Sequence, residues 1–245
     1  MDIFELRNIK ISLHQNYKQR LILDGVNLKI APKEHLGLFA PTGSGKTTLL
    51  RCLTGLIPKD SGEIFFHGSA ISTEADFQKL RRGVGFVVQE ASDQIFFPTV
   101  IEDVMFGPLN LGFSATDARQ RSLRLLETLG ILNLKDRNTL HLSGGEKRLV
   151  ALAGILAMEP EVLLLDEPTT GLDEQAVQRL EDILAHLDCA RIVVTHDPLF
   201  LSQVADTCYT IIDKKLIPMT TPIPHIHHHA HLGGDQMHEH MHGEM

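Results

Sequence analysis

Apolar and polar residues alternate in two segments near the start of the chain. Residues 3–13 and 26–30 carry apolar side chains at every second or third position, namely Ile3, Leu6, Ile9, Ile11, Val26, Leu28 and Ile30. This spacing predicts strands of a half-exposed antiparallel sheet. The dipeptide Asp24-Gly25 is typical of a turn, and we expect it to lie between strand-like segments.

A short apolar run, residues 36–40, leads directly into a glycine-rich loop. The residues after this loop, 47–56, have the pattern of a helix that stops near Pro58. Residues 63–66 predict another strand, which Gly68 closes.

The pattern becomes helical between about residues 99 and 140. Ser114 and Asp117 have the spacing of a capping box at the start of a helix that ends at Gly130. One face of that helix carries three leucines, Leu123, Leu126 and Leu129.

Helices and strands alternate again in the last third of the chain. The pattern predicts helices at about 144–158 and 174–187, and strands at 162–165 and 191–195. Such alternation is typical of an α/β fold with a largely parallel sheet and helices on its faces.

Composition and charge exclude several classes of protein. The 245 residues are 43% hydrophobic and carry a net charge of −8, which fits a folded chain and argues against a nucleic-acid-binding surface. The three cysteines form no CxxC pair, so we expect reduced thiols. The start lacks a signal-peptide pattern, and the longest apolar run, 149–158, is too short to span a bilayer. Another chain would therefore have to provide any membrane pore.

Residues 40–47, Ala-Pro-Thr-Gly-Ser-Gly-Lys-Thr, lie between a predicted strand and a predicted helix, as a phosphate-binding loop requires. The glycines let backbone N–H groups converge on phosphate oxygens, and Lys46 can reach the β- and γ-phosphates. The Thr47 hydroxyl can ligate Mg²⁺. The usual pattern opens with glycine where this chain has Ala40, a change we expect to be tolerated if the backbone φ there is negative.

A second candidate site lies at the end of the apolar strand 162–165, which runs into Asp166 and Glu167. A parallel strand places such carboxylates at the sheet edge where ligands bind. Asp166 would hold Mg²⁺, and Glu167 would orient and deprotonate an attacking water molecule.

The order of these motifs resembles the ATP-binding-cassette (ABC) family. Residues 142–146, Leu-Ser-Gly-Gly-Glu, match its signature sequence, and 165–169, Leu-Asp-Glu-Pro-Thr, follow at the family's spacing. Four further elements match as well: Tyr17 as the adenine-stacking aromatic, Gln89, residues 171–173 as the D-loop, and His196 as the switch histidine. The resemblance covers about residues 3–215.

The resemblance implies a P-loop NTPase fold with a RecA-like core, an N-terminal antiparallel β-subdomain and an inserted helical subdomain at about 90–145. The ATPase domain would comprise residues 1–218. ATP would contact Tyr17 and the phosphate-binding loop through Thr42, Gly43, Ser44, Gly45, Lys46, Thr47 and Thr48.

The resemblance also implies a head-to-tail dimer, expected to be a homodimer, with ATP trapped between the subunits. Ser143, Gly144, Gly145 and Asp173 of one subunit would contact the nucleotide of the other. Glu167, His196 and Gln89 would be catalytic, with Mg²⁺ held by Thr47, Asp166 and Gln89. Integral membrane subunits would bind the dimer at the cytoplasmic face of the cell membrane.

Residues 89–97 and 106–110 are similar to the ATPases of energy-coupling-factor transporters, especially cobalt and nickel importers. Gln94 followed by Ile-Phe is the more telling part, whereas Glu90-Ala91 departs from the Asn-Pro often found there. In that class this segment lies by the groove that receives the membrane partner. Alternatively, Phe96 and Phe97 are core residues.

A histidine-rich tail, 219–245, follows the globular pattern. Its imidazoles can bind Ni²⁺, Co²⁺ or Zn²⁺, and their irregular spacing predicts a disordered, multi-ligand segment. They are His225, His227, His228, His229, His231, His238, His240 and His242. A purification tag is an alternative origin, although no six histidines are contiguous.

Three functional hypotheses follow. The first is the motor ATPase of a nickel or cobalt importer, or of an importer for another substrate. The second is a soluble metal-binding or storage protein that ATP regulates, which only the tail suggests. The third is a non-transport cassette protein, but those commonly carry two cassettes or long coiled-coil insertions, and this chain has one motif set.

Overall fold

The computed structural model describes residues 2–15 and 18–219. The predictions for Tyr17 and for the histidine-rich tail therefore lie outside the described residues.

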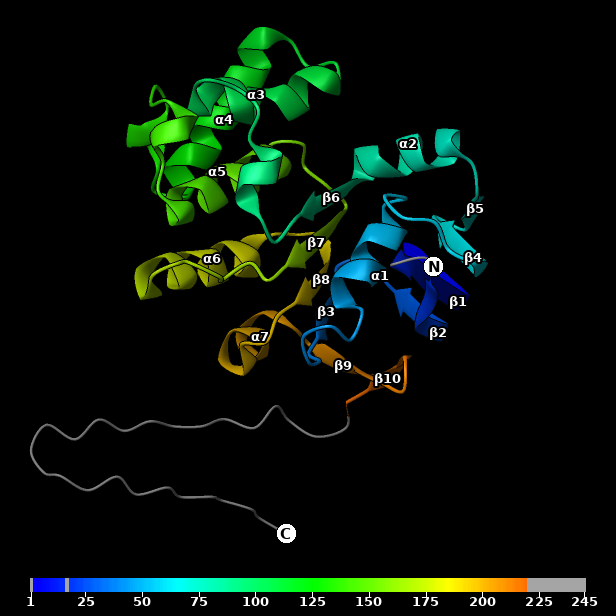
Figure 1. Cartoon of the computed structure of the whole chain (residues 1–245). Coiled ribbons are helices and arrows are strands. Elements are labelled where there is room, and N and C mark those ends of the chain that lie inside the picture. Colours follow the sequence, from blue (N-terminus) through cyan, green and yellow to red (C-terminus); the bar gives the residue numbers. More distant parts are fainter. Residues whose placement is uncertain (1, 16–17, 220–245) are drawn as a thin grey trace, which may run out of the picture.

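The N-terminal part forms an antiparallel sheet in the order β2-β1-β4-β5 (Figure 1). Its strands are β1 (Phe4–Gln15), β2 (Lys18–Ile30), β4 (Ser61–Phe66) and β5 (Ser69–Ile71). The apolar positions that predicted these strands are buried, and Ile9 and Val26 have no exposed surface. The antiparallel β-subdomain is thus confirmed, although β5 was not anticipated.

The expected turn at Asp24-Gly25 is wrong, because both residues lie within β2. The pairing of β1 with β2 steps from Ile9 opposite Val26 to Ile11 opposite Leu23, so that two residues of β2 face one residue of β1. Gly25 has a φ of 73°, which suits a bulge in a strand as well as a turn.

The core is a six-stranded sheet in the order β10-β9-β3-β8-β7-β6. Every neighbouring pair is parallel except β10 with β9. The strands are β3 (His35–Leu38), β6 (Val84–Val87), β7 (Val162–Asp166), β8 (Ala190–Val194), β9 (Thr207–Ile212) and β10 (Lys215–Pro218). The predicted parallel α/β core is confirmed.

Alternate residues of β7 face two separate apolar clusters. Val162 and Leu164 pack with the N-terminal sheet, whereas Leu163 and Leu165 pack with the helices on the other face. Burial on both faces explains the uninterrupted apolar run of this strand.

Four helices accompany the sheets: α1 (Lys46–Leu53), α2 (Glu74–Gly83), α6 (Glu174–His186) and α7 (Pro198–Val204). The other three gather on one side of the molecule, away from the N-terminal sheet (Figure 1), and are α3 (Val100–Asn110), α4 (Ala115–Thr128) and α5 (Gly144–Leu156). Ser114 caps α4 as predicted, because its hydroxyl accepts the Asp117 N–H at 3.1 Å.

The helical group is inserted between β6 and β7, together with the 3₁₀ helices η1 (Ala91–Gln94), η2 (Leu132–Leu134) and η3 (Thr139–His141). Within residues 2–15 and 18–219, no helix is both long and apolar enough to cross a bilayer.

Candidate active site

The glycine-rich loop connects the carboxyl end of β3 to the first residue of α1. Gly43 and Gly45 have φ values of 79° and 107°, in the left-handed region that favours glycine. A Cβ on Gly45 would lie 2.7 Å from Ile22 Cγ2, so no side chain fits there. Ala40 is buried and has a negative φ, as the expectation of tolerance required.

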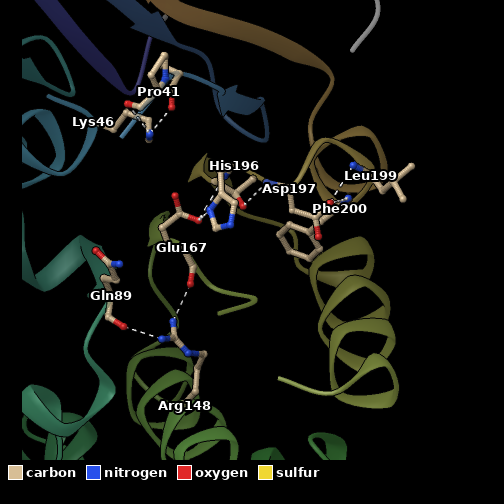
Figure 2. Close-up of polar contacts among 11 residues, drawn as sticks. Pro41, Lys46, Gln89, Arg148, Glu167, His196, Asp197, Leu199 and Phe200 are labelled. Carbon is tan, nitrogen blue, oxygen red and sulfur yellow. Dashed lines mark hydrogen bonds and ion pairs between the residues drawn. The ribbon is translucent and has the colours of Figure 1, made fainter. Parts of the chain in front are cut away.

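Lys46 is buried at the base of this loop and pairs with no carboxylate of the described residues. Its ammonium group donates to the carbonyl of Ala40 and, at 3.1 Å, to that of Pro41 (Figure 2). Burial lowers the pKa of Lys46, and the nearby Glu167 and Asp166 oppose that shift. The cation is thus held inside the loop with only neutral acceptors, where the phosphates of a nucleotide can replace them.

Asp166, the last residue of β7, is 1% exposed, and both its carboxylate oxygens are buried without a hydrogen-bond partner among the described residues. Burial raises the pKa of Asp166, while the nearby Thr47 hydroxyl partly opposes the rise. The Ser44 hydroxyl is similarly buried and unpartnered. Unsatisfied oxygens from a carboxylate and hydroxyls are the ligands that Mg²⁺ prefers, so these residues fit the ion.

Glu167 and His196 meet at the carboxyl ends of β7 and β8. The Glu167 Oε2 lies 2.7 Å from His196 Nδ1 and 3.3 Å from the His196 amide nitrogen (Figure 2). Glu167 has a φ of 49°, a strained value for a residue with a side chain. The sequence predicted both residues but not their contact.

The loop that carries His196 is braced on both sides. The Thr195 hydroxyl accepts the Asp197 N–H at 3.1 Å. Asp197 in turn caps α7 by accepting the N–H groups of Leu199 and Phe200 (Figure 2). These contacts fix the point at which the imidazole leaves the sheet.

The signature segment forms the N-terminus of α5. Ser143 caps the helix with a capping box, since its hydroxyl accepts the Glu146 N–H and its own N–H donates to the Glu146 carboxylate at 2.7 Å. Ser143 and Gly144 are exposed, and a Cβ on Gly144 would meet nothing within 4 Å. This helix end is open to a ligand from outside the chain.

The remaining predicted residues lie in three places. Thr42 is exposed in the loop, and Thr48 lies within α1. Asp173 caps α6 by accepting the Ala176 N–H at 2.8 Å, and Gly145 lies against the segment that carries Asp173. Gln89 is exposed and its side chain makes no hydrogen bond among the described residues, so its role as a magnesium ligand stays a prediction.

The sequence did not predict a role for Arg148, which lies between Gln89 and Glu167. Its guanidinium donates to the carbonyl of Glu167 at 2.8 Å and to that of Gln89 at 2.6 Å (Figure 2). The available signal was a charged residue at the start of the apolar run 149–158.

Gln94 also has a role that the sequence did not predict. Its side-chain amide accepts the Val88 N–H at 2.9 Å and donates to the Phe86 carbonyl at 2.7 Å. The side chain therefore pairs with the end of β6 as a neighbouring strand would, and fixes the loop that begins at Gln89.

A cavity of about 600 Å³ adjoins the glycine-rich loop. It is lined by three separate segments: Gln19, Arg20, Leu21 and Ile22 of β2, Gly43 and Ser44 of the loop, and Ile211, Asp213 and Lys214 around the β9–β10 turn. A cavity of this size beside a phosphate-binding loop can hold a nucleoside.

An apolar surface patch lies on the helical group. It comprises Phe96, Phe97, Phe106, Leu109 and Leu140, of which Phe96 is 72% and Leu140 is 81% exposed. The rings of Phe97 and Phe106 are 5.0 Å apart, and the Thr139 hydroxyl donates to the Phe97 carbonyl, which brings Leu140 to the same region. The core alternative is therefore wrong for Phe96, whereas Phe97 is half-buried.

The family model described as "ABC transporter" matches residues 23–170. A protein of Nitratidesulfovibrio vulgaris whose name includes "ABC transporter ATP-binding protein" is 45% identical, over 89% of this chain and 80% of its own length. The cobalt import ATP-binding protein CbiO of Rhodobacter capsulatus is 46% identical, over 75% of this chain and 67% of its own length. The energy-coupling factor transporter ATP-binding protein EcfA of Methanothermobacter thermautotrophicus is 40% identical, over 82% of this chain and 66% of its own length.

Two solved structures are also similar. The structure of cbiO1 from Clostridium perfringens, described as part of the ABC transporter complex cbiONQ, gives a TM-score of 0.76 at 32% identity and covers 88% of this chain and 87% of that one. A dimeric ATP-binding cassette in a post-hydrolysis state, bound to ADP and Pi, gives a TM-score of 0.79 at 26% identity and covers 87% of this chain and 96% of that one.

Proposed function

The chain belongs to the ABC transporter family of ATPases, and we propose that it is the motor subunit of an energy-coupling-factor importer for nickel or cobalt ions. The observation that carries the motor role is the unpartnered Asp166 carboxylate beside the Glu167–His196 pair, both next to the Lys46 loop. The similarity to CbiO and EcfA supports the transport class.

In the proposed reaction, the loop amides and Lys46 bind the β- and γ-phosphates of ATP. Asp166 and Thr47, joined by Gln89, would hold Mg²⁺, which would supply positive charge to the phosphate oxygens. Glu167 accepts a proton from a water molecule whose oxygen bonds to the γ-phosphorus, while the bond from phosphorus to the bridging oxygen breaks and ADP leaves. His196 would exchange its hydrogen bond with Glu167 for one to the γ-phosphate, which would free the carboxylate for the water molecule.

The working form that we propose is a head-to-tail homodimer. Ser143, Gly144 and Gly145 of one subunit contact the γ-phosphate bound by the other, and Asp173 lies at the same boundary. The exposed N-terminus of α5 supports this, because its free N–H groups and dipole favour an anion. The likeness to a dimeric cassette bound to ADP and Pi supports it too.

We propose that the apolar patch at Phe96 and Leu140 binds integral membrane subunits and thereby holds the protein at the cytoplasmic face of the membrane. Large aromatic side chains exposed together are typical of a protein interface. The patch follows Gln89 in the chain, so binding there can be linked to the nucleotide site.

The ATPase domain would comprise residues 1–218, with 219–245 as a separate metal-binding tail. The tail's imidazoles support a transition-metal cargo, but their affinities do not select nickel over cobalt. Deleting residues from 219 onward separates motor from storage protein: uptake that survives the deletion makes the tail accessory, and complete loss favours storage.

The test of the proposal is uptake of radioactive nickel and cobalt by cells that express the chain with its neighbouring genes. Glu167→Gln should abolish uptake of the transported ion, while Glu161→Gln, an exposed carboxylate at the other end of β7, should not. If uptake of both ions is unchanged by Glu167→Gln, the metal assignment is wrong although the family stands.

A further inference from the structure

The buried guanidinium of Arg148 joins two loops that carry proposed catalytic residues. Arg148 is 8% exposed and lies in the second turn of α5. Its two terminal nitrogens donate to the main-chain carbonyls of Glu167 and Gln89 (Figure 2). Because both acceptors are main-chain atoms, the contact fixes the position of each backbone whatever the side chains do.

The backbone of Glu167 requires such support. Its φ of 49° lies in the left-handed region, which residues with a side chain adopt at a cost in free energy. Its N–H donates to the Val194 carbonyl at 2.8 Å, and its own carbonyl accepts from Arg148 and from the Thr170 N–H. Contacts on both sides of the residue thus hold the conformation that directs the carboxylate to His196.

The charge of Arg148 has no paired carboxylate in residues 2–15 and 18–219, although three acidic residues lie near it. Burial lowers the pKa of Arg148, and Glu90, Asp166 and Glu167 oppose the shift. What distinguishes arginine here is its planar group, which reaches two separate carbonyls at once, whereas lysine presents its donors at one point.

We propose that Arg148 is a positioning residue for hydrolysis, because it holds the Glu167 backbone in the conformation that directs the carboxylate toward the attacking water molecule. The same guanidinium connects the Glu167 backbone to Gln89 and to α5. Since α5 begins at the signature segment, a movement of this helix displaces Gln89 and Glu167 together. The inference rests on the proposed role of Glu167 in activating water.

The chain offers a matched control in Arg191, on β8. Arg191 is 3% exposed and, like Arg148, donates to two main-chain carbonyls, those of Val204 and Leu184. Within the part of the chain that the structure describes, none of its side-chain hydrogen bonds involves a residue of the nucleotide site. Replacing it by lysine therefore imposes a similar structural loss without touching Glu167.

The experiment compares Arg148→Lys and Arg191→Lys in the full chain by kcat, KM for ATP and thermal midpoint. Arg148→Lys should lower kcat by about tenfold or more with KM changed by less than about threefold, because a small misplacement of a reacting group is costly in rate. Arg191→Lys should lower the thermal midpoint and leave kcat within about twofold.

Two results would overturn the inference. One is a kcat for Arg148→Lys that stays near the native value. The other is an equal fall in kcat for both variants, which would make the effect one of stability. Should Arg148→Lys not fold, Arg148→Gln, which keeps a planar donor for one carbonyl, takes its place. Native turnover in Glu167→Gln would instead remove the premise, independently of Arg148.

Discussion

The Glu167 carboxylate and the His196 imidazole lie 2.7 Å apart, although 29 residues separate them in the chain. They meet because β7 and β8 are parallel neighbours, so residues that follow each strand emerge at the same edge of the sheet. One contact therefore joins a group that can accept a proton to a group that can donate to a phosphate.

Glu167→Gln should lower the rate of ATP hydrolysis about 10²–10⁴-fold while ATP still binds, because the amide cannot accept the proton of water. Unhydrolysed ATP should then favour the dimer. Steady-state ATPase assays and gel filtration with and without ATP would measure the two effects. Glu161→Gln, just before the strand that Glu167 follows, should behave as the native protein in both assays. Turnover by Glu167→Gln at the native rate would exclude Glu167 as the base.

Asp166→Asn should stabilise the nucleotide-free protein at neutral pH and abolish magnesium-dependent hydrolysis. Burial raises the pKa of Asp166, so its ionised form destabilises the fold above the unfolded-state pKa. The gain from asparagine should be absent in acid, grow between the unfolded and folded pKa values, and be complete above both. Thermal unfolding against pH would measure it, with about 2–4 °C expected for each kcal/mol relieved.

The exposed Asp136→Asn provides the control for that series, because its side chain is 75% exposed and should change the midpoint little at any pH. A lower midpoint for Asp166→Asn at neutral pH would mean that the carboxylate is satisfied in the nucleotide-free protein.

The parts of the site that the sequence predicted are those encoded in one continuous segment. The loop around Lys46 and the strand ending in Asp166 each combine a strand, a turn and reactive side chains within a few neighbouring residues. Such motifs are predictable from the sequence because the same few residues determine both the backbone conformation and the reactive side chains.

Contacts between distant segments were not predictable in this way. The acceptors of Arg148 are main-chain carbonyls 19 and 59 residues away. Every residue has such a carbonyl, so residue types do not reveal which one accepts a hydrogen bond. The strand β6 has only four residues and follows α2 without a turn, so nothing in the pattern separates it from the helix. Its identity as a strand depends on pairing with β7, far along the chain.

Two substitutions in the glycine-rich loop should have opposite outcomes. Ala40→Gly should change ATP affinity by less than about threefold, since the φ of Ala40 is already negative. Gly45→Ala should abolish detectable ATP binding, because its φ is 107° and the new Cβ would lie 2.7 Å from Ile22. Titration with a fluorescent ATP analogue would measure both, and normal binding by Gly45→Ala would mean that the loop has another conformation when occupied.

Mixing two inactive variants should restore activity if the sites form between subunits. Lys46→Ala removes the phosphate contact of one subunit, and Ser143→Arg blocks the signature segment of the other. In a mixed dimer one site receives both defects and the other receives none, so random mixing should recover up to about a quarter of the native sites. ATPase activity at increasing mixing ratios would measure this, and a mixture no more active than its components would contradict a shared site.

Phe96→Ser should separate membrane coupling from hydrolysis. Because Phe96 is 72% exposed, its loss leaves no cavity, and the stability and the ATPase rate of the isolated protein should stay within about twofold of the native values. Association with the membrane subunits should fall by tenfold or more, on the order expected for a buried aromatic anchor. Leu199→Ser, at a half-exposed leucine of α7, is the control and should leave association intact. Co-purification from detergent extracts, measured beside ATPase activity, distinguishes the two, and a Phe96→Ser protein that co-purifies normally would mean that the membrane subunits bind another face.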